Sequence, residues 1–322
     1  MQSLRTKPVR DDPYLPLLRN VHVQPMFILG CHRSGTTLLY KLLVATECFN
    51  FVNAYHIFRY DEILFNYMNH TYDYARKELS TLFQSFGLRD RVIDAVAVSP
   101  DMPEEYGFIL RNAGYPPNLS PNTLHYFIEI CKKVQFISAS DRPLLLKNPW
   151  DFPNFIYLKG AFPAAKFIFI HRYPIHVINS QLRALRVSLS SKNIYNTLIS
   201  RRYAQLVESP IRFSMARLFW SLRFGLGTRI LTRRMRRGTT YFLKNIASLP
   251  KADYLSLKYE DLCRDPESQI TRILQFLGLN AAACPAYDPL IAPRQLSLLP
   301  EIARRQTYIL RKLHPYCVYF GY

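Results

Sequence analysis

The sequence predicts an α/β fold, in which a parallel β-sheet is flanked by helices on both faces and carries helical insertions. Short, continuously apolar runs alternate with helix-like segments at least four times, and such runs are typical of parallel strands. Polar residues and glycines follow these runs, at the sheet edge where open α/β sheets bind ligands. The 322 residues suit one large α/β domain or two small ones. We expect a single domain over 1–322, with a basic helical insertion at about 187–250.

The first strand and helix are predicted around a glycine-rich loop. Residues 26–29 are apolar, Gly30 ends the run, and residues 36–43 have the spacing of a helix that buries one face. The spacing from Gly30 to Gly35 is that of a phosphate-binding P-loop, whose amides and helix dipole attract an anion. The usual lysine after the second glycine is missing, and the nearest cation, Arg33, lies within the loop. This favours a phosphate ligand over the site of a magnesium-dependent nucleoside triphosphatase.

Three further segments predict strands: a short apolar one in 142–149 that ends in Lys147, a continuously apolar one at 166–171, and one in 254–262 that ends near Tyr259. Lys147, Arg172 and Tyr259 fall at or near their carboxyl ends. Helices are expected at 73–86, at 150–160, after Pro174, and from Pro266 to Gly278, where proline begins and glycine ends the pattern. The carboxyl ends of parallel strands share one edge, so these side chains and the glycine-rich loop predict one composite site.

The net charge of +19 predicts an anionic ligand, substrate or surface. The six cysteines are dispersed without metal-binding spacing, which is typical of reduced thiols in a reducing compartment. The N-terminus lacks the apolar core of a secretory signal, and no run approaches the roughly 20 apolar residues of a membrane span. We therefore expect a cytoplasmic protein, soluble or peripheral at a membrane.

The segment 201–237 is rich in arginine, with interleaved aromatic and aliphatic residues and a single acid, Glu208. Two interpretations stay open for it. One is a pair of helices with solvated arginines, and the other is peripheral contact with anionic lipid.

Three blocks of the sequence resemble the sulfotransferases that use 3′-phosphoadenosine 5′-phosphosulfate (PAPS). The blocks are FILGCHRSGTTLL, then LLLKNP with FPAAKFIFIHRYPIHVINSQLRA, and YLSLKYEDLCRDPESQITRILQFLGL. They cover about a third of the chain and follow the family's order. The Arg-Ser-Gly-Thr-Thr loop is most similar to the bacterial and Golgi-type branches. The resemblance implies a P-loop-like sheet and sulfuryl transfer from PAPS, which releases adenosine 3′,5′-bisphosphate (PAP).

The resemblance also implies roles for single residues. The 5′-phosphosulfate of the donor would contact Arg33, Ser34, Gly35, Thr36 and Thr37. Arg33 would stabilise the leaving group, and Lys147 would contact the sulfuryl or bridging oxygen. Arg172 and Ser180 would hold the 3′-phosphate, and Tyr259 would lie beside the adenine. No metal is expected.

Transfer to a hydroxyl or amine needs a general base. His56 is the first candidate, because related branches keep a base after the loop helix, and Glu104 and Glu105 are rivals. The acceptor is not identified by the sequence; a small molecule, a lipid or a carbohydrate fits, and no nucleic acid is expected. The oligomeric state is equally open. The alternative functions are a P-loop kinase-like phosphotransferase and a basic membrane-binding non-enzyme.

Overall fold

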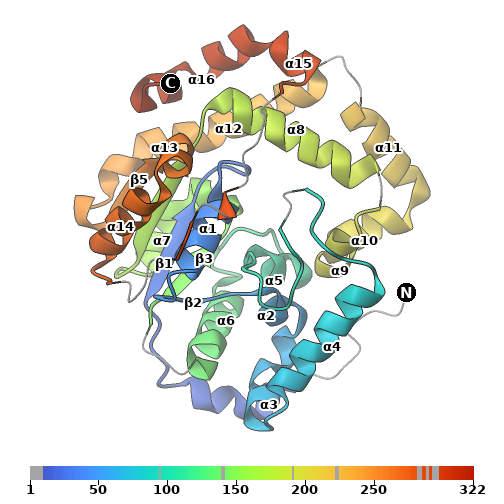
Figure 1. Ribbon diagram of the computed structural model, residues 1–322, viewed down its shortest axis with the longest axis vertical. Helices are drawn as coiled ribbons and strands as arrows, with labels where there is room; N and C mark the ends of the chain where they lie inside the picture. Colours follow the sequence, from blue (N-terminus) through green and yellow to red (C-terminus); the bar gives the residue numbers. More distant parts are fainter. Residues whose placement is uncertain are drawn as a thin grey trace.

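The computed structural model describes residues 10–93, 96–138, 142–190, 192–221, 225–280, 285–287, 290–291 and 297–322. Within them lies one five-stranded sheet, in which all strands are parallel and the order is β2-β3-β1-β4-β5 (Figure 1). The strands are β1 (Pro25–Leu29), β2 (Asn50–Phe51), β3 (Leu144–Lys147), β4 (Lys166–His171) and β5 (Tyr254–Lys258). The predicted parallel α/β sheet is confirmed.

Four of these strands are the predicted ones. The apolar residues of β1, β3 and β4 are buried on both faces, whereas β5, at the edge of the sheet, buries only Leu257. The fifth, β2, has only two residues, too few for a periodic pattern, and the sequence did not predict it. The fourth predicted strand, expected within 254–262 to end near Tyr259, is β5. It ends at Lys258, and Tyr259 begins the helix α13 (Tyr259–Arg264).

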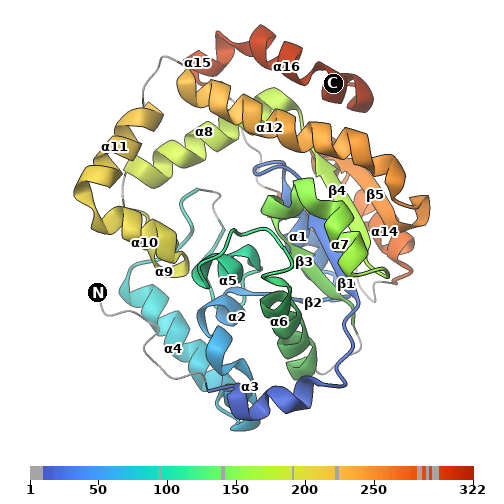
Figure 2. The same ribbon diagram turned by 180° about the vertical axis from the view of Figure 1, so that it is seen from behind.

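Alternate residues of each strand face opposite layers of helices. Met26 and Ile28 pack with α1 (Thr36–Val44) and α14 (Pro266–Leu277) on one face (Figure 1). On the other face, Phe27 and Leu29 belong to a core that includes α6 (Leu124–Ile137), α7 (Phe155–Ala161) and α12 (Leu226–Asn245) (Figure 2).

The other helices lie around this three-layered centre. They are α2 (Ala54–Phe58), α3 (Ile63–Met68), α4 (Tyr72–Ser85), α5 (Gly107–Asn112), α8 (Pro174–Ser190), α9 (Ile194–Ile199), α10 (Arg201–Glu208), α11 (Pro210–Ser221), α15 (Pro300–Ala303) and α16 (Gln306–Phe320). Short 3₁₀ helices are η1 (Asp12–Leu18), η2 (Tyr60–Glu62), η3 (Pro149–Asn154), η4 (Ile246–Ser248) and η5 (Lys251–Asp253). None of the described helices combines the length and apolar content needed to cross a bilayer.

The basic insertion expected at about 187–250 contains α9 to α12; residues 191 and 222–224 of it lie outside the described residues. Helices α9, α10 and α11 follow one another along the outer side of the molecule, and α11 packs against α8 (Figure 1). Helix α12 runs back across the top of the sheet and packs against both α8 and α16.

Candidate active site

The loop between β1 and α1 depends on its two glycines. A Cβ at Gly30 would lie 2.5 Å from Ser34 Oγ and 2.6 Å from the Ile170 carbonyl oxygen. Gly35 has φ of 105°, and a Cβ there would lie 2.2 Å from Tyr259 Cδ2. Only glycine satisfies both the backbone conformation and the close approach at this second position.

Arg33 is held in this loop in an uncommon conformation. Its backbone φ is 71°, in the left-handed region that residues other than glycine rarely adopt. Its Nε donates to Ser180 Oγ at 3.1 Å, and its Nη2 donates to the carbonyl of Ile93 at 3.1 Å. The side chain of Gln181 donates to the His32 carbonyl at 2.7 Å. Helix α8 therefore holds both the loop backbone and the arginine in place.

Arg172, at the end of β4, connects the loop to Tyr259. Its Nη1 donates to the Arg33 carbonyl at 3.2 Å, and its guanidinium carbon lies 4.1 Å from the centre of the Tyr259 ring. The two arginines come from adjacent parallel strands and lie together, as the sequence predicted.

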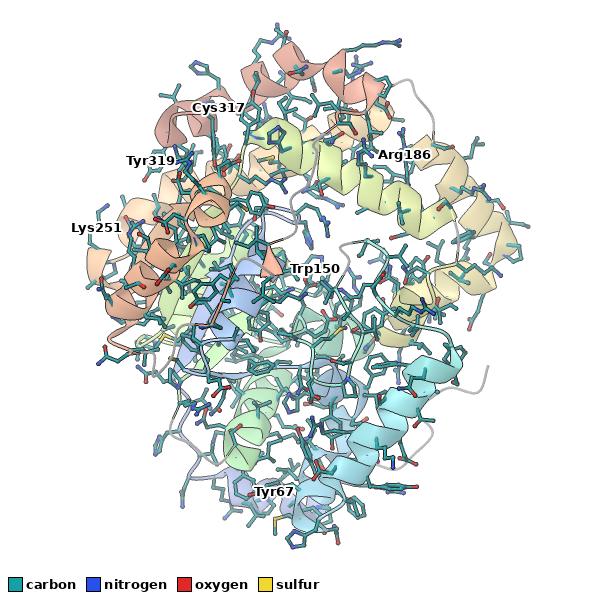
Figure 3. The ribbon with its side chains drawn as sticks, in the orientation of Figure 1. Tyr67, Trp150, Arg186, Lys251, Cys317 and Tyr319 are labelled. Carbon is teal, nitrogen blue, oxygen red and sulfur yellow. The ribbon has the colours of Figure 1, made fainter. Side chains whose placement is uncertain are left out.

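A cavity of about 430 Å³ opens over this edge of the sheet. Six of the predicted site residues line it: Arg33, Gly35, Thr36, Thr37, Arg172 and Tyr259. Lys41, Arg91 and Arg234 add positive charge, and Glu105 is the one acidic residue among the described residues of its lining. The cavity is therefore suited to an anion. Trp150, Phe108 and other apolar side chains line it as well, and Figure 3 shows Trp150 near the centre of the molecule, below α8.

Lys147 is not among the described residues that line the cavity, but it contacts two that are, Glu105 and Thr37. Its side chain is fully buried, and its Nζ lies 2.6 Å from Glu105 Oε1 and 3.4 Å from Thr37 Oγ1. Burial acts to raise the pKa of Glu105, but the positive charges of Lys147 and Arg91 and the hydrogen bond from Lys147 outweigh it, so the pKa is lowered from its usual 4.5. Glu105 is thus a carboxylate at neutral pH.

Glu104 has a different surrounding from its neighbour. It is fully buried, and both its carboxylate oxygens accept hydrogen bonds from Arg91 Nη1, at 3.1 and 3.0 Å. It also accepts from the Tyr195 hydroxyl at 2.6 Å and from the Glu105 amide at 3.0 Å. Glu104 anchors the segment that presents Glu105.

Asp151 fixes the turn that follows Lys147. It accepts hydrogen bonds from the Tyr106 hydroxyl, the Leu119 amide and the side-chain amides of Asn148 and Asn154, at 2.6 to 2.8 Å. Burial raises the pKa of this carboxyl. The buried carboxyl thus joins three segments around the end of β3.

His56 is not among the described residues that line the cavity. It occupies the third position of α2, where its Nδ1 accepts from the Asn53 amide at 3.1 Å and its own amide donates to Asn53 Oδ1 at 3.0 Å. Burial lowers its pKa to about 3. These contacts are those of a helix-capping residue.

Ser34 and Ser180, which were predicted to bind the donor, are not among the described residues that line the cavity. Ser180 contacts Arg33, as above. Ser34 is 1% exposed, and its hydroxyl is buried with no partner among the described residues. No group of three or more His, Cys, Asp or Glu side chains within the described residues is placed to hold a metal ion, and independence from metal stays a prediction.

The sequence did not predict several cavity residues. His32 lies in the glycine-rich loop, and burial lowers its pKa to about 4. Gln181 follows Ser180 in the sequence, and this position could have indicated that it lies at the site. No local pattern places Arg91 and Arg234 there, because only the folded chain brings their segments to this edge.

Comparisons of the sequence with known proteins agree on a single family. A sequence model described as "Sulfotransferase family" matches residues 25–219 and 212–283. The chain is 24% identical over 283 residues to omega-hydroxy-beta-dihydromenaquinone-9 sulfotransferase Stf3 of Mycobacterium bovis and of Mycobacterium tuberculosis. Each match covers 81% of this chain and 64% of the relative, so the chain spans less than two thirds of the length of these curated relatives.

Solved structures show the same fold. Sulfotransferase STF9 of Mycobacterium avium superposes with a TM-score of 0.64 at 16% identity, covering 96% of this chain and 79% of that one. Sulfotransferase STF1 of Mycobacterium tuberculosis gives a TM-score of 0.61 at 16% identity, covering 94% and 79%. Because the family match extends over well more than half of the chain, the protein belongs to the sulfotransferase family.

Proposed function

We propose that the chain is an enzyme that transfers a sulfuryl group from PAPS to a hydroxyl or amine of a small-molecule acceptor and releases PAP. Family membership supports this proposal. The observation that carries it is the joint position of Arg33 and Arg172, which line one cavity and are joined by a hydrogen bond of 3.2 Å. These are the two points at which a nucleotide with phosphates at both 5′ and 3′ positions needs cations.

The residues at this edge fit such a donor. The first-turn amides of α1 have no intrahelical acceptors, and no side chain caps this end of the helix, so Thr36 and Thr37 can offer backbone N–H groups to an anion. Arg33 and Lys147 would meet the phosphosulfate end. Arg172 offers a guanidinium to the 3′-phosphate, with Ser180 behind Arg33. Tyr259, beside Arg172, offers an aromatic ring to the adenine.

The bound donor supplies a sulfuryl group whose S–O bond to the 5′-phosphate breaks as a new S–O bond to the acceptor forms. Lys147 donates N–H groups toward the leaving oxygen, where negative charge develops. Glu105 takes the proton of the acceptor hydroxyl. Its lowered pKa keeps it deprotonated before the reaction, and its partner Lys147 lies 2.6 Å away. We prefer Glu105 to His56 because Glu105 lines the cavity and His56 caps α2.

The acceptor that fits best is an apolar molecule with a free hydroxyl. Apolar side chains from four different elements line the cavity: Phe108 of α5, Trp150 of η3, Leu185 of α8 and Leu231 of α12. The relatives in mycobacteria are named for an omega-hydroxylated menaquinone. We propose a small-molecule or lipid acceptor of this kind, with a carbohydrate as the less favoured choice.

The test is transfer of radioactive sulfate from ³⁵S-labelled PAPS, with release of PAP measured in parallel. We expect labelled product with a hydroxyl-bearing isoprenoid quinone or a similar lipid alcohol, and little with sugars. In a thermal-shift panel, PAP should stabilise the protein by about 2.7 kcal/mol at 100 times its dissociation constant. Equal stabilisation by ADP would favour a kinase, and stabilisation by an oligonucleotide alone would favour a nucleic-acid-binding protein.

A further inference from the structure

The outward face of α11 carries a stripe of exposed apolar side chains. Ile211, Met215 and Leu218 are 75%, 66% and 62% exposed. Their spacing of four and then three residues places them on one side of the helix, within roughly 60° at about 100° per residue. Exposed aliphatic residues are usually scattered, so three in line on one helix indicate a surface that contacts something apolar.

The orientation of this stripe is fixed by contacts on the opposite side of α11. Phe213 is buried, and the carbonyl of Trp220 accepts from Arg186 Nε of α8 at 2.9 Å. Figure 3 shows Arg186 on the side of α8 that faces α11, and Figure 1 shows α11 at the periphery of the molecule. The stripe therefore faces solvent because the other side of the helix is committed to the protein.

Positive charge flanks the stripe on both sides. At about 100° per residue, Arg212 and Arg217 lie roughly 100° to either side of the three apolar residues. Arg201 and Arg202 are exposed on the adjoining α10, and Glu208 is the one acid in 201–221. An apolar stripe between arginines matches the boundary between acyl chains and phosphate groups of a bilayer. A second copy packed on a twofold axis would bring these arginines toward one another, which disfavours self-association.

The wall of the cavity adjoins this surface. Gln181, Ala184, Leu185 and Ser188 of α8 line the cavity and recur at the spacing of one helix face. Arg186 of the same helix binds α11. One helix thus separates the cavity from the element that carries the stripe.

We propose that α11 docks on an anionic phospholipid membrane, with Ile211, Met215 and Leu218 in the bilayer interface and the flanking arginines on lipid phosphates. Docking itself does not depend on the proposed sulfuryl transfer. Together with that function, it places the wall of the active-site cavity one helix away from a lipid acceptor.

The experiment is co-sedimentation of the full chain with vesicles of phosphatidylcholine alone and of phosphatidylcholine with 30% phosphatidylglycerol. The wild-type protein should bind the anionic vesicles and bind the neutral ones far less. The triple variant Ile211→Ser, Met215→Ser, Leu218→Ser should lose at least tenfold in partition coefficient. Its matched control is Val318→Ser, Tyr319→Ser on α16, where the side chains are 65% and 53% exposed; it should bind like the wild type.

The variant Arg212→Gln, Arg217→Gln separates charge from apolar insertion. It should lose about thirtyfold in binding to anionic vesicles, because each basic residue near such a surface contributes about 1 kcal/mol. The thermal shift with PAP reports whether a variant is folded and binds the donor. A variant that keeps this shift but no longer binds anionic vesicles has therefore lost membrane docking specifically.

Three results would overturn the proposal: wild-type protein that stays in solution with anionic vesicles, a triple variant that binds them as the wild type does, or a control that loses as much. A wild-type dimer in light scattering that the triple variant abolishes would assign the stripe to self-association instead.

Discussion

Arg172 joins three parts of the site through a single side chain. It binds the backbone of the glycine-rich loop, stacks on Tyr259 and faces the cavity. A lysine would keep the charge but lose the planar fork that makes such simultaneous contacts. At this scale, the proposed recognition of a 3′-phosphate depends on one guanidinium.

Replacing Arg172 by Ala should lower the affinity for PAP about 10- to 100-fold. A hydrogen bond to a charged group contributes about 1.5–3 kcal/mol. Affinity for adenosine 5′-monophosphate, which lacks the 3′-phosphate, should fall much less, as measured by isothermal titration calorimetry. Arg183→Ala on α8, whose side chain binds Ser297, is the control and should leave both affinities unchanged. Equal losses for the two nucleotides would remove Arg172 from the 3′-phosphate site.

Glu105→Gln should reduce kcat by about 10²–10⁴ if Glu105 is the general base. Binding of PAP should persist or tighten, because the change removes a negative charge beside Lys147. His56→Gln is the comparison, since glutamine also serves at the third position of a capped helix and should preserve the fold and the rate. The assignment fails if His56→Gln loses activity while Glu105→Gln retains it, with kcat and PAP affinity measured for both.

At the scale of elements, the loop between β1 and α1 depends on backbone conformation. Gly35→Ala would strain a φ of 105° and drive a methyl group into Tyr259. We expect a loss of about 1–3 kcal/mol in the free energy of unfolding together with loss of PAP binding. Gly160→Ala in α7 has open space around its Cβ and should stabilise by about 0.4–1 kcal/mol without affecting PAP. Urea denaturation and calorimetry of the pair measure this; a Gly35→Ala protein that binds PAP normally would contradict it.

Local patterns were sufficient to predict most elements near the site. β1, β3 and β4 are short apolar runs, β5 is a short strand-like segment, and α14 is bounded by Pro266 and Gly278 as expected, with Asp265 accepting from the Ser268 amide. The two-residue β2 carries no such pattern and forms only because its neighbour β3 offers a partner.

The same distinction applies to site residues. Arg33 was predicted from its place in the glycine-rich loop and Arg172 from its place at the carboxyl end of an apolar strand, with the resemblance to the sulfotransferases. The position of Glu105 depends on its neighbour Glu104, which contacts Tyr195, 91 residues away in the chain. No spacing in the sequence reports such a contact, so the choice between His56 and the two glutamates stayed open.

At the scale of the whole molecule, three histidines are held in the neutral form: His56 and His171 are buried, and His32 is partly buried at the cavity. Burial lowers the pKa of His32 to about 4 and the pKa values of His56 and His171 to about 3. In the unfolded chain, each would take up a proton near pH 6.5. Between about pH 6.5 and 4, the unfolded state therefore binds more protons than the native state, and stability falls as pH falls.

Each histidine should contribute a slope of about 1.4 kcal/mol per pH unit, or roughly 4 kcal/mol for the three together. Urea denaturation at pH 7, 6 and 5 measures this slope. His56→Gln should reduce it by about a third; a slope that does not change in this variant would show that His56 titrates alike in the folded and unfolded chain.

A crystal structure of the protein with PAP tests the central claim most directly. The account predicts the 5′-phosphate at the N-terminus of α1, within hydrogen-bond distance of the Thr36 and Thr37 amides, and the 3′-phosphate on the guanidinium of Arg172. A nucleotide bound away from this cavity, or one whose 3′-phosphate does not contact Arg172, would contradict it.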